Sequence, residues 1–236
     1  MERIHGCVEF DKNEHSNAIV TVTVRGTSPL MMHRMSDETM MELFNRTRPQ
    51  RKDVTLLQKA EEGIYRRESD GRIVLPSMCL QAACVEAGRQ VVYERKTMLS
   101  TKETSKVPAI LDFRDEEYEI IPNPEPNGPD GEKLWTVDKR RGLLRNGANK
   151  TAVPIVRGKF KNWGFETEIH FDPTDPKVGA DKVKELIRIA GRYIGLGSFR
   201  PMCRGNFGQF VVTKFAVEYY TPPQWEEVLG ISQAAK

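Results

Sequence analysis

Four stretches of the chain are rich in β-branched or regularly alternating apolar residues, which predicts strands. In the first, Val20, Val22 and Val24 share one face, and Gly26 ends the run. In another, apolar residues at 165, 169 and 171 are expected inward, and Glu166, Glu168 and His170 outward. Pro154 cannot donate a ladder hydrogen bond, so its strand is expected at a sheet edge. The predicted strands are residues 18–25, 151–157, 165–171 and 209–219.

Two further stretches show the spacing of amphipathic helices. In the first, apolar residues recur at the i, i+3, i+4, i+7 and i+11 positions, and Ser77 is the expected N-cap. The second covers about residues 181–194 and repeats this spacing. The two apolar stripes are Leu80, Ala83, Cys84, Ala87 and Val91, and Val183, Leu186, Ile187, Ala190 and Ile194.

The resulting order is strand, helix, strand, strand, helix, strand. This order predicts an α+β fold with one ferredoxin-like, split βαβ core, which is also the topology of the RNA-recognition motif. We expect a single domain over residues 1–236 with long insertions at about 35–72 and 95–151. A helix is expected at 54–62, and the proline- and glycine-rich residues 123–131 predict a mobile loop. The stacking aromatics of an ordinary RNA-recognition motif are missing from the first strand.

Composition narrows the class of protein further. With 39% hydrophobic and 29% charged residues and no long apolar run, the chain is expected to be soluble, without a signal peptide or membrane span. Its four cysteines form no C-x-x-C pair, which favours buried thiols in a reducing cytoplasm. We expect no metal and no cofactor.

Charge is distributed in blocks, although the net charge is only +3. Residues 139–161 contain eight basic residues and no acidic one, and residues 46–52 form a second basic cluster. Residues 112–132 are strongly acidic. Either basic block alone could be a solvated face, but two blocks beside insertions indicate a nucleic-acid track. The acidic block would repel the same ligand or pair with a basic patch on a neighbouring subunit.

A glycine-rich loop at residues 195–208 lies between the second helix and the last strand, and contains Arg200 and Arg204. Bare backbone N–H groups beside two guanidinium groups can cradle phosphate. A helix C-cap followed by a turn is the structural alternative. Neither a dinucleotide fingerprint nor a G-x-x-x-x-G-K-[ST] phosphate loop is present.

Three short motifs resemble the RAMP superfamily of CRISPR systems: Gly-Thr-Ser-Pro-Leu at 26–30, Leu-Pro-Ser-Met-Cys-Leu-Gln-Ala at 75–82, and the glycine loop at 195–208. The layout over residues 18–220 is most similar to the Cas-seven type, a backbone subunit with thumb-like insertions. The first helix lacks the Gly-x-x-Arg ending common in that family, so a stand-alone or virus-encoded relative stays an alternative.

The resemblance implies a subunit that coats guide RNA through its sugar-phosphate backbone and forms homo-oligomers along it, beside other effector subunits. Such binding would be independent of sequence. The implied RNA contacts are Thr27, His33, Arg34, Arg46, Arg48, Arg51, Arg140, Arg141, Arg145, Arg200, Arg204, Gly205 and Gly208.

Other functions share these features, although we expect the chain not to be an enzyme and assign no catalytic residue. A guide-processing endoribonuclease of the same superfamily would use one of His5, His15, His33 and His170 as general acid or base. Target cleavage through Asp37 is a second enzymatic version, against which Asp37 is a first-turn acid of a short helix. A filament-forming protein that coats single-stranded nucleic acid without a guide is the third alternative.

Overall fold

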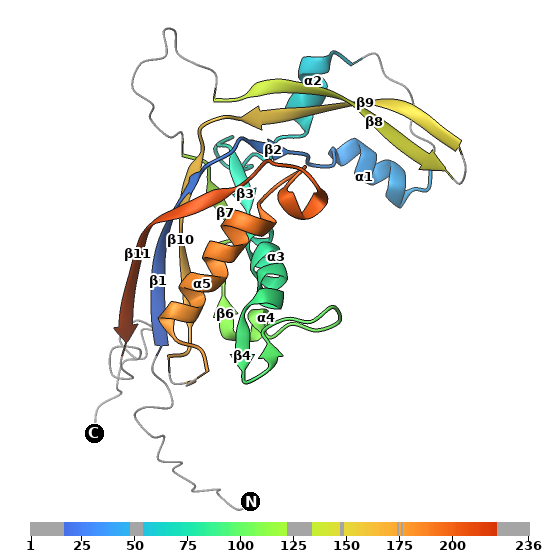
Figure 1. Cartoon of the computed structure of the whole chain (residues 1–236). Coiled ribbons are helices and arrows are strands. Elements are labelled where there is room, and N and C mark those ends of the chain that lie inside the picture. The colour runs from blue at the N-terminus through green and yellow to red at the C-terminus, as the bar shows by residue number, and fades with distance from the viewer. Residues whose placement is uncertain are drawn as a thin grey trace, which may run out of the picture.

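The computed structural model describes residues 17–47, 54–121, 134–146, 149–173, 175 and 177–220. In these residues the fold is mixed α and β, with five α-helices and several small antiparallel sheets (Figure 1). No helix among them is long and apolar enough to cross a membrane. The α-helices are α1 (Asp37–Phe44), α2 (Leu56–Glu62), α3 (Ser77–Ala87), α4 (Val107–Ile110) and α5 (Ala180–Ile189). The strands are β1 (Asn17–Gly26), β2 (Leu30–Met32), β3 (Val74–Pro76), β4 (Val92–Glu94), β5 (Thr97–Met98), β6 (Leu111–Asp112), β7 (Glu117–Glu119), β8 (Thr136–Asn146), β9 (Asn149–Phe160), β10 (Gly164–Phe171) and β11 (Phe210–Tyr220).

The largest sheet has the strand order β11-β1-β10-β6, and every neighbouring pair in it is antiparallel. Helices α3 and α5 pack against each other and cover one face of this sheet (Figure 1). The core lies between these layers, where the predicted valine face of β1 is buried together with the apolar stripes of both helices. Three predicted strands and both predicted helices are therefore present with nearly the expected bounds.

The predicted strand at 151–157 belongs to a different sheet, which corrects the expected core. It is part of β9, which pairs with β8 over residues 149–159 and with β2 only at residues 158–160. The place beside β10 is taken by the two-residue strand β6. Pro154 lies where β9 has β8 on one side alone, as the missing N–H requires. Strands β8 and β9 project from the sheet as a long ribbon (Figure 1).

Two smaller predictions also differ from the structure. Ser77 is the first residue of α3 rather than its N-cap, because Pro76 occupies the cap position and no side chain caps the helix. His170 was expected to point outward, yet it is only 7% exposed. Its strand is flanked by β6, where Asp112 is the residue opposite His170. The predicted helix at 54–62 is present as α2, with Thr55 and Gln58 forming a capping box.

Candidate nucleic-acid interface

The glycine loop follows α5, which continues into a π-turn at Ala190–Ile194. Three of its glycines have positive φ, namely Gly195 (74°), Gly197 (69°) and Gly208 (70°). Two residues with side chains share this rare conformation, Phe199 (54°) and Arg204 (62°). So many left-handed residues in one loop fold the chain back sharply before β11 begins.

The loop's own backbone explains why Gly205 and Gly208 are glycines. A Cβ at Gly205 would lie 1.7 Å from the carbonyl oxygen of Phe199, and one at Gly208 would lie 1.9 Å from that of Leu196. Both glycines therefore allow the loop to pack on itself. The structural alternative stated from the sequence accounts for these two positions, and direct contact with RNA stays a prediction for them.

Phe199 and Phe207 place the loop against the β8–β9 ribbon. The Arg157 guanidinium lies 4.4 Å from the Phe199 ring centre, and the Arg140 guanidinium lies 4.6 Å from that of Phe207. The Lys159 ammonium lies 6.0 Å from the Phe207 ring. These distances are typical of cation–π contacts. The fold thus brings together the two regions that the sequence singled out, the basic block and the glycine loop.

The register of the ribbon determines which basic residues take part. Arg140 is opposite Ile155, and Asp138 is opposite Arg157, so Arg140, Arg157 and Lys159 share one face. Lys139 and Arg141 lie on the other face, because side chains alternate along a strand. Arg140 and Arg141 were predicted as one contact group, and the structure separates them.

Arg157 is a functional candidate that the sequence reasoning placed in the basic block without singling it out. Its Nε and Nη1 atoms are buried and have no hydrogen-bond partner among the described residues. Burial lowers its pKa, an effect that Asp138 opposes and Arg140 reinforces. Arg157 therefore adds a positive charge to the basic face, while its buried Nε and Nη1 atoms are enclosed by the fold.

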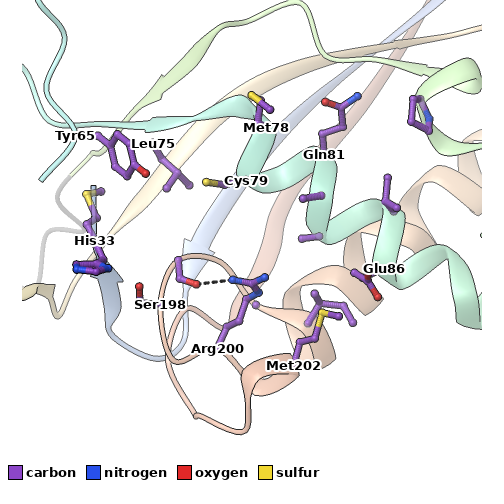
Figure 2. A pocket seen from close by; sticks show the side chains of 18 residues that line it. His33, Tyr65, Leu75, Met78, Cys79, Gln81, Glu86, Ser198, Arg200 and Met202 are labelled. Carbon is purple, nitrogen blue, oxygen red and sulfur yellow. Dashed lines mark hydrogen bonds between the residues drawn. The ribbon is translucent and has the colours of Figure 1, made fainter. Parts of the chain in front are cut away.

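Beside this contact is a hollow of about 700 Å³ between the glycine loop, α3 and the end of β2 (Figure 2). Arg200 extends from the loop into it, and its Nη1 donates to the carbonyl oxygen of Gly197 at 2.9 Å. His33, Tyr65 and Cys79 line the same space. The remaining wall is mostly apolar, with Leu75, Met78, Ala82, Val85, Ile194 and Met202. The hollow also contains the carboxylate of Glu86, which pairs with Arg89 at 3.0 Å. Arg200 at the loop and the apolar wall of α3 suit a ligand with an anionic group and a flat, uncharged part.

Two titrating groups in the hollow are held uncharged. Burial lowers the pKa of His33, and the nearby charges of Arg157 and Lys59 lower it further. Burial raises the pKa of the Cys79 thiol, although Arg200 opposes this shift. Arg200 therefore carries the positive charge of the hollow at neutral pH.

The other predicted contact residues lie in several places. Thr27 lines a second hollow between α5 and β11. Arg34 is ion-paired with Asp37, and Arg46 is exposed just after α1 with a φ of 53°. Arg204 is exposed at the tip of the glycine loop. Arg48 and Arg51 lie outside the described residues, as does the side chain of Arg145.

Part of the acidic block is paired within the chain. Arg67 Nε donates to Glu117 at 2.6 Å, and Arg72 Nη1 donates to Glu119 at 2.8 Å. Asp70 joins the same network through Arg67. Strand β7 carries both glutamates and pairs with β3, which lies close to the two arginines in sequence. These carboxylates therefore have partners within this chain, and pairing of the acidic block with a neighbouring subunit stays a prediction.

The structure describes residues that the enzymatic alternatives would use, including Asp37 and His170. Asp37 is the first residue of α1, directly after the N-cap Ser36, as the first-turn interpretation predicts. His170 Nδ1 is buried without a hydrogen-bond partner among the described residues. His5 and His15 lie outside the described residues.

Comparison with known proteins finds similar structures but no similar sequences. No protein-family model matches the chain, and no curated relative matches it either. One similar structure is Cmr6 from Pyrococcus furiosus, at 10% identity and a TM-score of 0.41, with 83% of this chain and 98% of that chain covered. Another is the Csm3–Csm4 subcomplex of the type III-A CRISPR-Cas interference complex, at 10% identity and a TM-score of 0.41, with 89% and 83% covered. Because both TM-scores are below 0.5, the likeness carries no argument about the function of this chain.

Proposed function

We propose that this chain is an RNA-binding subunit that holds a single guide strand by its sugar-phosphate backbone in a CRISPR-type effector complex. The observation that carries this proposal is the contact between the basic face of the β8–β9 ribbon and the glycine loop, beside the hollow that contains Arg200. The same surface carries three cations from the ribbon and one from the loop. Such a surface neutralises phosphates without reading bases.

The topology supports a ferredoxin-like core for this subunit. Numbered along the chain, β1, β6, β10 and β11 give the spatial order fourth, first, third, second, with α3 after the first strand and α5 after the third. That is the order of a split βαβ unit with an unusually short second strand. The ribbon then corresponds to the thumb-like insertion, and α1 and α2 to the first insertion.

The hollow gives the strand a fixed path. A phosphate at Arg200 would place the adjoining nucleotide against Met78, Ala82 and Val85 of α3. An apolar wall accepts any base, because every base has an apolar face. The proposed binding is therefore tolerant of sequence, as a subunit that repeats along a guide requires.

The two faces of the ribbon provide a matched test. Arg140→Gln with Lys159→Gln removes two charges from the face against the glycine loop, and Lys139→Gln with Arg141→Gln removes two from the opposite face. We expect the first pair to weaken binding of a mixed-sequence 30-nucleotide RNA about tenfold or more at 0.1 M salt, because each lost phosphate contact removes about 0.7 from the slope of log affinity against log salt. The second pair should change affinity much less. Equal effects of both pairs, or none, would contradict the proposed interface.

Copurified nucleic acid separates the guide function from general coating. The protein is purified without nuclease, and the bound nucleic acid is sequenced. Short RNAs of uniform ends support the guide function, and random RNA or DNA fragments contradict it. Preference for single-stranded DNA over RNA in competition would indicate the coating protein instead.

A further inference from the structure

A second hollow, of about 530 Å³, lies between α5 and the first residues of β11. Its cationic wall is formed by Lys184, Arg188 and Arg192. The opposite wall is Thr27 and the run from Gln209 to Val212. None of these residues lines the hollow beneath the glycine loop.

The three cations form a row along α5 and the π-turn that follows it. They are exposed, and none of the ion pairs found between described residues involves them. Lys184 and Arg188 are one helical turn apart, about 6 Å along the axis. Arg192 follows one turn later, in the π-turn. Three like charges at this spacing repel one another, so a bound polyanion with charges at a similar repeat would be stabilised.

Close packing and a hydrogen bond join the two walls of the hollow. Gly191 lies in the π-turn, where a Cβ would come 2.4 Å from the Phe210 carbonyl oxygen, so glycine allows this turn to pack against β11. Gln209 Nε2 donates to the Arg192 carbonyl oxygen at 2.9 Å and ties the two walls together. π-turns within helices are frequent at functional sites.

Aromatic rings stand next to the cations. Lys184 lies 5.6 Å from the Phe215 ring centre, and Arg192 lies 5.5 Å from that of Tyr193, which is 48% exposed. Cations beside an accessible ring are typical of surfaces that bind single-stranded nucleic acid, where phosphates meet the charges and bases stack. An acidic peptide would use the charges but would leave Tyr193 without a stacking partner.

We infer that the α5–β11 hollow binds the phosphates of a single-stranded nucleic-acid segment, at a site separate from the glycine-loop interface. Lys184, Arg188 and Arg192 contact successive phosphates, and Tyr193 stacks with a base at one end. The inference does not depend on the proposed function, because it uses a different set of residues on a different element.

Charge removal at this site is the first test. The variant combines Lys184→Gln, Arg188→Gln and Arg192→Gln, and its control combines Lys96→Gln, Lys102→Gln and Lys106→Gln, three exposed lysines outside both hollows. The probe is a fluorescent 12-nucleotide oligouridine, titrated from low to moderate salt, with melting temperature measured for each protein. The salt dependence of log affinity should become less steep by about 2 in the variant, from about 0.7 per phosphate. The same slope in the variant and in the control would overturn the inference.

Two further arms separate this site from the glycine-loop interface and from other ligands. In the Arg140→Gln, Lys159→Gln background, remaining oligouridine binding should be lost on adding the three α5 changes, and photo-crosslinks should map to the peptide with Tyr193. If that background binds like the wild type, the proposed function fails while the α5 test still stands. Competition by uridine monophosphate as strong as by the oligomer would overturn the strand assignment, as would binding of an oligoglutamate peptide in place of the oligonucleotide.

Discussion

At the scale of single residues, the partly buried side chain of Arg157 is expected to lower the free energy of unfolding. Two of its donor atoms are buried without partners among the described residues. An unsatisfied buried donor costs about 1–3 kcal/mol. Arg157→Met keeps the length and apolar stem and removes the unpaired donors. We expect the free energy of unfolding to rise by about 1 kcal/mol and RNA affinity to fall.

The control for Arg157 is Arg140→Met on the same face. Arg140 is exposed and its Nε is 2.6 Å from Asp138, so its removal should give no gain in stability. Denaturant titration and RNA titration on both variants decide the matter. A loss of stability in Arg157→Met would show that its contact with Phe199 outweighs the burial of its donors.

Gly208 tests the structural explanation of the glycine loop. Gly208→Ala combines a φ of 70° with a Cβ placed 1.9 Å from the Leu196 carbonyl oxygen. We expect a loss of more than about 2 kcal/mol, because strain and a backbone clash add. Gly71→Ala is the control, since its φ is 72° and nothing lies within 4 Å of the added Cβ. It should cost only about 1 kcal/mol. Equal losses, measured by denaturant unfolding, would show that the clash is relieved by a shift of the loop.

At the scale of elements, the pairing of β10 with β6 makes stability depend on pH through His170. Burial lowers the pKa of His170, and Arg114 lowers it further, while Asp112, Glu168 and Asp115 oppose the shift. Below the ordinary histidine pKa of about 6.5, the unfolded chain takes up a proton that folded His170 refuses. Stability should therefore be unaffected by this group above about pH 7 and fall as the pH drops towards the lowered pKa.

The variant His170→Gln isolates this contribution. Its free energy of unfolding should vary less between pH 7.5 and 5.5 than that of the wild type. His33 shifts in the same direction, so His33→Gln is measured in parallel. An identical pH profile for the wild type and His170→Gln would contradict the assignment to His170.

The elements that could be predicted from sequence are those that bury a regular row of apolar side chains. β1 and α5 place apolar residues at the periods of a strand and a helix, and both lie in the core as expected. Residues 151–157 were assigned to the wrong sheet because, in its described residues, β9 is buried only near the end that pairs with β2. The local sequence pattern of the strand therefore does not reveal its partner. β6 is two residues long and leaves no periodic signal.

Part of the candidate site could likewise be predicted from the sequence, and part could not. Glycines and arginines mark the loop in the sequence, but the contacts of Phe199 with Arg157 and of Phe207 with Arg140 join residues 42 and 67 positions apart and have no local signature. The α5 cations could have been found, because Lys184, Arg188 and Arg192 recur at i, i+4 and i+8 on the polar face of a predicted helix.

At the scale of the whole molecule, the projecting ribbon suits assembly along a shared strand. A subunit that holds RNA beside its ribbon leaves the strand free to continue to the next copy, which gives a head-to-tail contact. We expect the number of copies bound to rise stepwise with RNA length in native mass spectrometry. Arg140→Gln with Lys159→Gln should reduce this number at equal protein concentration. A one-to-one complex at all RNA lengths would contradict assembly along RNA.

The pairing of β1 with β11 has a consequence for folding during translation. β1 spans residues 17–26 and β11 spans 210–220, so the sheet gains its outermost strand only after most of the chain has been translated. At about 5–20 residues per second, β1 waits roughly 10–40 s for this neighbour. Throughout that interval one edge of a valine-rich strand is open to other nascent chains. The protein is therefore expected to depend on chaperones during synthesis, and more so when translation is slowed.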